Sequence, residues 1–388
     1  MTHWHIITGE YPPQPGGVSG YTRRIAQGLA NAGDRVDVWA PPAVDPECAD
    51  PGVTVWRLPD RFGPRALRML SRGLDRQPAP RRLLVQYVPH AFGWKAANVP
   101  FCLWLQSRRR DSIWVMFHEV AFPFDRDQAV SRNALAVVNR LMASIVASSA
   151  ERAFVSIPGW QPMVESMIGE GKPVEWLPVP SSIPIASDPA ASAIARARYA
   201  GSHPLVGHFG THGIAIRELL DASIPTLVDA TDCRMLLLGR RSDETARELV
   251  AKHPRLADRL HGTGVLTDAA VSQHVAACDL MMQPYPDGVS TRRTSAMVGL
   301  SHGVPLVTTS GTLTEPLWEE SGAIELVRAD QPRMLATAAA RLLSSPARRE
   351  TLATRGHELY LSRFDIRHSI GTLREADAQS GDLTAVHA

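Results

Sequence analysis

The sequence of 388 residues lacks several features that mark common classes of protein. Its formal net charge is only +2, so the charge balance gives no indication of a nucleic-acid partner. No apolar run reaches the roughly 18–20 residues that cross a bilayer. The first residues show no basic segment followed by a long apolar core, so a secretory signal is not expected.

Cysteine and lysine are also scarce. The four cysteines, Cys48, Cys102, Cys233 and Cys278, lie far apart and form no CxxC pair. This spacing argues against a zinc site or a disulfide scaffold, and it fits a reducing cytoplasm. Nearly all of the 41 Lys and Arg residues are arginines, so an anionic ligand would be held mainly by guanidinium groups and backbone amides.

Buried-strand patterns alternate with helical patterns along the chain, which predicts an α/β fold with parallel sheets. Strands are predicted first at residues 3–8, 35–40, 82–88, 113–118 and 152–157, and then at 204–209, 234–238, 280–283 and 304–308. A proline-rich segment at 177–184 separates the two runs and is typical of an interdomain linker. We predict an N-terminal domain at 1–180, a C-terminal domain at 181–365, and at 366–388 a helix that can return to the N-terminal domain, frayed from about residue 378. Ligands of such sheets bind at the carboxyl ends of the strands, so the cleft between the domains is the expected site.

The strongest local signal is the sequence PGGVSG at 15–20, between the first predicted strand and a helix predicted at 21–31. Glycines let a ligand approach the backbone, and a helix N-terminus offers free N–H groups and a partial positive charge. Phosphate or a sugar hydroxyl would fit there, although a simple cluster of turn glycines has the same composition.

A second signal is PYPDGVSTRRT at 284–294, which follows a predicted strand and opens a helix predicted at 290–301. Ser290 or Thr291 would cap this helix. Arg292 and Arg293 in its first turn would oppose the helix dipole unless an anion such as a diphosphate lies between them. The alternative is a surface helix with unfavourable charges.

Histidines accompany two further strand ends. The glycine-rich turn GHFGTHG at 207–213 follows one strand, and His118 stands at the end of another. The spacing of His203, His208 and His212 matches no specific metal-ligand pattern, so we predict no metal site. A hydrogen-bonded core histidine is the alternative explanation of His118.

Two short motifs match enzymes of other folds by chance. GLSHG at 299–303 resembles the nucleophile elbow of hydrolases, but here a predicted helix precedes the serine and a strand follows it. The DRD tripeptide at 125–127 resembles the metal-binding DxD of another sugar-transferase fold, yet it lies in a polar loop.

An arginine-rich stretch runs from Arg57 to Arg82 with apolar residues between the arginines. Such a stretch could contact an anionic membrane surface weakly or hold an acidic acceptor. The commoner explanation is a solvated helix with one buried face. We accordingly expect a cytoplasmic protein, with the inner face of the membrane as the alternative location.

Taken in order, these segments resemble the family-4-type glycosyltransferases of the GT-B fold. The resemblance rests on GEYPP at 9–13, GGV at 16–18, LANAGDRVDV at 29–38, VEWLP at 174–178, MLLLG at 235–239, ACDL at 277–280, GVPLV at 303–307 and Glu315. It implies two Rossmann-like doubly wound domains facing a central cleft, with the acceptor bound N-terminally and a nucleotide-diphosphate-sugar bound C-terminally. It also implies transfer with retention, without a metal or a further cofactor, in bacterial polysaccharide or glycoconjugate biosynthesis.

The resemblance and the local signals together define the expected site. The residues expected to act in catalysis are His118, Gly17 and Arg292. Those expected to bind the donor are Gly16, Gly17, Val18, Gly210, Thr211, Arg217, Gly239, Arg240, Asp287, Ser290, Thr291, Arg292, Arg293 and Thr294.

The sequence departs from the family at two points. Ser290 and Val298 stand where the family has its two glutamates, and no lysine lies near Arg217, the expected phosphate-binding arginine. We expect residues 290–293 to take over the phosphate contacts. Two alternatives remain: an inactive glycosyltransferase-like binding or scaffold protein, and a nucleotide-sugar epimerase of the GT-B type.

Overall fold

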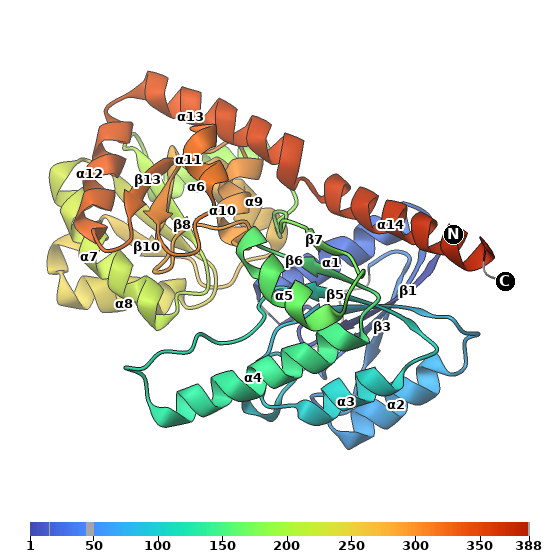
Figure 1. Ribbon diagram of the computed structural model, residues 1–388. Helices are drawn as coiled ribbons and strands as arrows, with labels where there is room; N and C mark the ends of the chain where they lie inside the picture. Colours follow the sequence, from blue (N-terminus) through green and yellow to red (C-terminus); the bar gives the residue numbers. More distant parts are fainter. Residues whose placement is uncertain (15, 44–49, 387–388) are drawn as a thin grey trace. The chain divides into compact units, whose positions relative to one another are not determined.

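The computed structural model describes residues 1–14, 16–43 and 50–386, with side chains up to residue 378 (Figure 1). It divides into two compact units. Unit 1 comprises Met1–Pro178 together with the segment that begins at Ile366, and unit 2 comprises Val179–Asp365. The sequence-based division has its boundaries after residues 180 and 365.

Unit 1 is built on a seven-stranded parallel sheet in the order β3-β2-β1-β4-β5-β6-β7. Its strands are β1 (His3–Thr8), β2 (Arg35–Ala40), β3 (Val53–Arg57), β4 (Arg82–Tyr87), β5 (Ser112–Phe117), β6 (Arg152–Val155) and β7 (Val174–Trp176). Its helices are α1 (Gly17–Asn31), α2 (Pro64–Leu74), α3 (Val99–Ser107), α4 (Val130–Ser149), α5 (Gln161–Ile168) and α14 (Ile366–Val386), with short 3-10 turns at Trp94–Ala96 and Pro158–Trp160. The central strands are apolar on both faces, as expected of a parallel sheet covered by helices on both sides.

The C-terminal helix α14 packs on α1 (Figure 1). A Cβ atom on Gly28 of α1 would lie 2.6 Å from Ile370 of α14, so the missing side chain permits the close approach of the two helices. Arg82 and Thr2 bond to Asp377 of the same helix. The predicted fraying from residue 378 is not seen, because α14 continues to Val386.

Unit 2 contains a six-stranded parallel sheet in the order β10-β9-β8-β11-β12-β13. Its strands are β8 (Leu205–Phe209), β9 (Arg234–Leu238), β10 (Leu260–Gly262), β11 (Leu280–Gln283), β12 (Leu306–Ser310) and β13 (Glu325–Arg328). Its helices are α6 (Pro189–Tyr199), α7 (Ile214–Ala230), α8 (Ser242–Lys252), α9 (Asp268–Ala276), α10 (Thr294–Ser301), α11 (Pro316–Ser321), α12 (Pro332–Leu343) and α13 (Pro346–Leu359), with a 3-10 turn at Pro254–Leu256 and a π-helical turn at Tyr360–Phe364. Two apolar clusters, one containing Trp318 and Phe364 and the other Leu220 and Leu335, form its core.

The nine strands predicted from the sequence are present, and their ends shift by at most two residues. Two predicted helix starts are wrong. Helix α1 begins at Gly17 rather than residue 21, because the backbone N–H of Gly20 already donates to the carbonyl of Gly16. Helix α10 begins at Thr294 rather than residue 290, for reasons given with the site.

Cys48 lies outside the described residues, and the other three cysteines are buried and free. No helix in the described part of the chain combines the length and the apolar composition needed to cross a bilayer.

Candidate functional site

Each sheet changes direction of strand order at one point. When the strands are numbered within each unit, both sheets contain the order 3-2-1-4-5-6. The reversal lies between β1 and β4 in unit 1 and between β8 and β11 in unit 2. Loops that leave neighbouring strands in opposite directions open a crevice at such a point, where α/β sheets bind ligands. The glycine-rich segments noted in the sequence follow β1 and β8, so the topology places them at the two switch points.

In unit 1 the loop after β1 is packed tightly. A Cβ atom on Gly9 would lie 2.5 Å from the carbonyl oxygen of Ala91, and one on Gly16 would lie 2.4 Å from Oε2 of Glu10. Gly16 precedes α1, whose first turn contains no acidic residue and receives no side-chain cap. Gly17 and Val18 are therefore residues of this first helical turn rather than of a loop, and Gly17 is exposed.

Two acidic residues at this edge are not among the site residues predicted from the sequence. Glu10 follows β1, and burial raises the pKa of its carboxyl group although His90 and Arg61 act in the opposite direction. Glu119 follows β5 by two residues, with Oε2 3.6 Å from Nδ1 of His90. The signal that could have identified both is a charged residue placed directly after a buried strand.

His118 follows β5 directly, where the sequence places it. Its Nε2 is 2.7 Å from Oε1 of Gln86, and its ring meets Tyr21 edge to face at 4.7 Å between centroids. A carbonyl oxygen only accepts, so Nε2 carries the proton and Nδ1 is left as an acceptor. Burial lowers the pKa of His118 to about 3, so the imidazole is neutral at pH 7.

In unit 2 the turns that follow β8 and β9 interlock. The N–H of Gly210 donates to the carbonyl of Leu238, and Nδ1 of His212 lies 3.1 Å from the carbonyl oxygen of Arg240. Gly239 has φ +100°, and a Cβ atom there would lie 2.3 Å from the carbonyl oxygen of Gly210. The structure thus brings together Gly210, Thr211, Gly239 and Arg240 of the predicted donor site, with Thr211 and Arg240 exposed.

The histidines of this region do not form a metal cluster. His208 and His212 meet edge to face at 5.1 Å, with Nδ1 of His208 close to the carbonyl of Met282. His203 is partly exposed and pairs instead with Asp232 at 2.7 Å. Nε2 of His208 and of His212 is buried without a hydrogen-bond partner among the described residues. Burial lowers the pKa of His208 to about 3, and it also lowers the pKa of His212. Both rings are therefore neutral at pH 7, each with one donor and one acceptor nitrogen.

The segment 284–294 is held by acidic residues in a way the sequence analysis did not foresee. Arg292 and Arg293 both pair with Asp287, the first at 2.5 Å, and the guanidinium of Arg293 lies over the ring of Tyr285. The two arginines are therefore not in the first turn of α10, as predicted, but in the turn before it. Arg293 occupies the N-cap position of α10 without a capping bond.

Thr291 does not cap α10 either. Its backbone N–H and its hydroxyl both donate to Oε1 of Glu315, whose Oε2 accepts from Nε1 of Trp318. The hydroxyl of Ser290 is buried and has no hydrogen-bond partner among the described residues. Because Glu315 and Asp287 draw residues 291–293 away from helical geometry, the helix starts at Thr294. Glu315 is thus the residue that positions this loop.

Arg217 lies in the first turn of α7, a helix that follows the 210–213 turn and has no side-chain cap at its N-terminus. Its guanidinium pairs with Glu248 of α8 at 2.6 Å. Unlike the arginines near residue 290, it is held by a carboxylate that is half exposed, so solvent screens the pair strongly.

The two chance motifs have structural roles. Ser301 is buried at the end of α10 and donates to the carbonyl of Val298. Asp125 and Asp127 lie in an exposed loop, where Asn133 donates to the carbonyl of Asp125. Val298, at the position of the second family glutamate, is fully buried in the core of unit 2.

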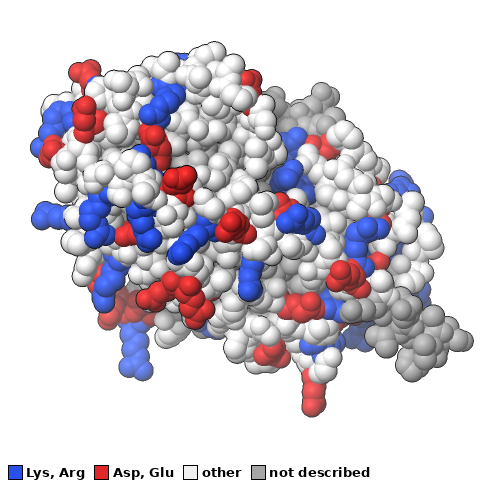
Figure 2. Space-filling model, turned by 90° about the horizontal axis from the view of Figure 1, so that it is seen from above, with Lys and Arg blue, Asp and Glu red and all other residues white. Residues whose placement is uncertain are grey.

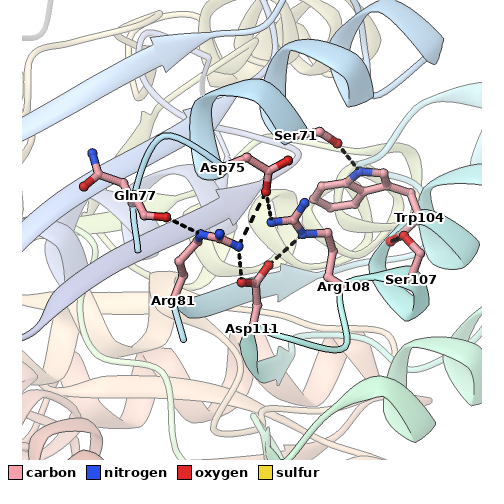
Figure 3. Close-up of polar contacts among 8 residues, drawn as sticks. All are labelled: Ser71, Asp75, Gln77, Arg81, Trp104, Ser107, Arg108 and Asp111. Atoms are coloured by element: carbon pink, nitrogen blue, oxygen red, sulfur yellow. Dashed lines mark hydrogen bonds and ion pairs between the residues drawn. The ribbon is translucent and has the colours of Figure 1, made fainter. Parts of the chain in front are cut away.

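The arginine-rich stretch is divided between internal ion pairs and a solvated helix face. Arg81 and Arg108 both contact Asp75 and Asp111, so that four charges compensate one another beneath the end of α2 (Figure 3). The helix α2 itself buries Ala66, Leu70 and Leu74 and exposes the arginines between them. On the face of the molecule shown in Figure 2, basic and acidic side chains are interspersed rather than gathered into a patch of one sign.

Comparison with known proteins places this architecture in one class. The model of the family "Glycosyl transferases group 1" matches residues 204–345, which lie within unit 2. Sucrose-phosphate synthase from Thermosynechococcus elongatus is similar in structure, with a TM-score of 0.74, 18% identity, and coverage of 98% of this chain and 100% of that one. HepE from Anabaena, solved in complex with UDP-glucose, has a TM-score of 0.67, 16% identity, and coverage of 98% and 100%. WaaG, a glycosyltransferase of lipopolysaccharide biosynthesis, has a TM-score of 0.62, 14% identity, and coverage of 94% and 96%. No curated protein matches the sequence.

The fold is that of the GT-B glycosyltransferases, with two Rossmann-like units on one chain, as the sequence predicts. Residues 204–345 match the model of a group 1 glycosyltransferase domain.

Proposed function

We propose that unit 2 binds a nucleoside-diphosphate sugar and that the protein transfers the sugar to an acceptor held by unit 1, with retained anomeric configuration and without a metal or further cofactor. The observation that supports this most is the group 1 domain match, whose residues include the switch point of unit 2. HepE was solved with UDP-glucose, so uracil is the first base to test.

The donor diphosphate would lie at the 210–213 turn and the N-terminus of α7. The helix N-terminus supplies backbone N–H groups and a positive dipole end, and Arg217 of α7 and Arg240, whose carbonyl contacts His212, add positive charge. The buried hydroxyl of Ser290 and Nε2 of His208 are polar atoms without a hydrogen-bond partner in the described part of the chain, and such atoms are normally satisfied by water or ligand in native proteins.

Arg292 and Arg293 would stabilise the charge that develops on the leaving diphosphate. Both already share Asp287, so they are held in place before the ligand arrives rather than ordered by it. Preorganised charges of this kind contribute most of the stabilisation in such reactions, because they need no reorganisation during the step. Asp287 would then position the arginines and compete with the diphosphate for them.

In unit 1, His118 would contact the transferred sugar. Its neutral ring offers Nδ1 to a sugar hydroxyl while Gln86 fixes the ring through Nε2. A residue that accepts a hydrogen bond from a sugar hydroxyl in this way orients the sugar, and its low pKa keeps it neutral near pH 7.

Calorimetric titration with UDP, GDP, ADP, CDP and TDP tests the donor assignment. We expect one diphosphate to bind at micromolar concentration in the presence of EDTA. If none binds below millimolar concentration, the proposal is wrong. Once a base is found, transfer or donor hydrolysis distinguishes an enzyme from an inactive scaffold. The anomeric configuration of the product, read by NMR, tests retention, and sugar interconversion without an acceptor would indicate an epimerase instead.

A further inference from the structure

A group of ligand-type side chains lies outside the candidate site, at the start of the unit 1 sheet. His3 and His5 stand on the same face of β1, and Asp37 is the register partner of His5 on β2. One potential metal-ligand atom from each of the three residues lies within 4.8 Å of the other two. It is the only group of this kind among the described residues, and the glycine-rich loop that follows β1 lies at the opposite, carboxyl end of that strand.

The hydrogen bonds define which atoms carry lone pairs. Nε1 of Trp39 is 3.4 Å from Nδ1 of His5, and an indole nitrogen only donates. Nδ1 of His5 is therefore an acceptor with no proton of its own. It lies 3.6 Å from Oδ2 of Asp37 with no hydrogen between the two atoms, and among the described residues its single lone pair is shared only with the indole at 3.4 Å, a long contact that a metal ion would replace.

The carboxylate of Asp37 is not satisfied by protein alone. The residue is 3% exposed, and its Oδ1 atom is buried without a hydrogen-bond partner among the described residues. Its Oδ2 atom lies 2.7 Å from Nε2 of His3. An unpartnered oxygen on a buried carboxylate is costly, and a cation bound by this carboxylate and the two imidazole nitrogens would offset that cost by compensating the negative charge.

We propose that His3, His5 and Asp37 form a binding site for a divalent transition-metal ion, with zinc as the best match. Two imidazoles and one carboxylate are ligands that zinc prefers, and three protein ligands leave a fourth position for water. The side chain of His3 is 24% exposed, which provides a route of entry from solvent. The ion would link β1 to β2 and stabilise unit 1, and it would take no part in sugar transfer.

Zinc titration of the metal-free protein tests the site. The full chain without a histidine tag is treated with EDTA, dialysed and titrated with Zn²⁺ by calorimetry. We expect one tight site per chain and a higher melting temperature with zinc, since a ligand that binds only the folded state stabilises it. Asp37→Asn and His3→Asn should each weaken zinc binding by about a hundredfold or more, beyond the 10–100-fold typical of second-shell changes.

Two further variants control the assignment. His203→Asn removes a histidine that also pairs with an aspartate at 2.7 Å, on unit 2, and should leave the tight site intact. Trp39→Phe keeps all three ligands, so zinc should still bind, while the change in tryptophan fluorescence caused by binding should decrease.

Equal zinc binding by wild type, Asp37→Asn and His3→Asn would overturn the proposal, as would the absence of a tight site in the wild type. If Asp37→Asn fails to fold, His3→Asn decides, because His3 is partly exposed at the first position of its strand. Far-UV circular dichroism of the metal-free variants establishes which of them are folded.

Discussion

The two units share one strand order but carry opposite chemistry at their switch points. In unit 1 the loops after β1 and β5 supply the carboxylates of Glu10 and Glu119 beside neutral His118. In unit 2 the loops and helix start supply Arg217, Arg240 and the pair 292–293. An anionic diphosphate would be favoured by the second set and repelled by the first, whereas sugar hydroxyls would suit the first. Under the proposed function, one strand frame would therefore divide donor and acceptor binding through its loop residues.

The largest expected effect comes from breaking the interlocked turns of unit 2. Gly239→Val places a side chain at φ +100° and within 2.3 Å of the carbonyl oxygen of Gly210. We expect a loss of about 3 kcal/mol of stability, since both strain and a clash with backbone must be relieved. Urea unfolding followed by circular dichroism measures the effect.

Gly213→Ala is the matched control for this change. Gly213 lies in the same region, has φ −64°, and has nothing within 4 Å of a Cβ atom. A loss of stability in Gly213→Ala as large as in Gly239→Val would show that the region is generally fragile and that the interlock is not the cause.

The strand frame could be predicted from the sequence, and the loop conformation could not. Apolar runs such as residues 234–238 are buried on both faces, so their composition alone indicates strands. The short edge strands β7 and β10 have three residues each, too few to show a pattern. The start of α10 depends on Glu315, which follows Thr291 by 24 residues, and no local rule reveals that contact.

The same reason explains which site residues the sequence missed. His118 and Gly210 follow strands directly, so their place at the carboxyl edge was predictable. That Arg292 and Arg293 share Asp287 depends on the folded path of a turn. Likewise His3, His5 and Asp37 meet only because β1 and β2 pair in a particular register.

The second prediction tests the positive charge of unit 2. Arg292→Ala and Arg293→Ala should each weaken diphosphate binding by about 1.5–3 kcal/mol, as expected for charge-assisted contacts. Calorimetric titration measures this once the base is known. Arg328→Ala is the control, because Arg328 also pairs with an aspartate on unit 2 but lies on an exposed strand end. Unchanged affinity in both test variants would remove these arginines from the diphosphate site.

The third prediction concerns acid, which should weaken both units through their buried neutral histidines. The folded protein keeps His118 and His208 neutral down to a pKa of about 3, whereas the unfolded chain takes up protons near pH 6.5. Acid therefore favours the unfolded chain, and each residue should cost about 2 kcal/mol of stability between pH 7.5 and 5. Above about pH 7.5 neither residue makes stability depend on pH.

Melting temperatures at pH 7.5 and 5 test this in variants. His118→Asn and His208→Asn should each show a smaller decrease on acidification than the wild type, whereas His203→Asn, which changes a partly exposed residue, should behave like the wild type. An undiminished decrease in both core variants would mean that neither histidine is neutral because of burial.

The fourth prediction separates orientation from binding in unit 1. His118→Ala should lower kcat for transfer or donor hydrolysis about tenfold, because a lost hydrogen bond to the sugar is worth about 1.4 kcal/mol. Nucleotide affinity should not change, since unit 2 would bind the diphosphate. His90→Ala, which removes the exposed neighbour of Glu119, is the control. Normal turnover in folded His118→Ala would exclude the residue from the site.

The smallest effect is expected at the solvated face of α2. Arg65, Arg68 and Arg72 recur on that face with exposed Met69 between them, and no carboxylate pairs with these three among the described residues. If this face touches an anionic bilayer, each arginine contributes about 1 kcal/mol near the surface, and the effect disappears at high salt. Flotation with vesicles containing phosphatidylglycerol should then show weak binding that Arg68→Ala reduces and Arg328→Ala does not. Absence of binding by the wild type at low salt would mean that this face of α2 is only solvated.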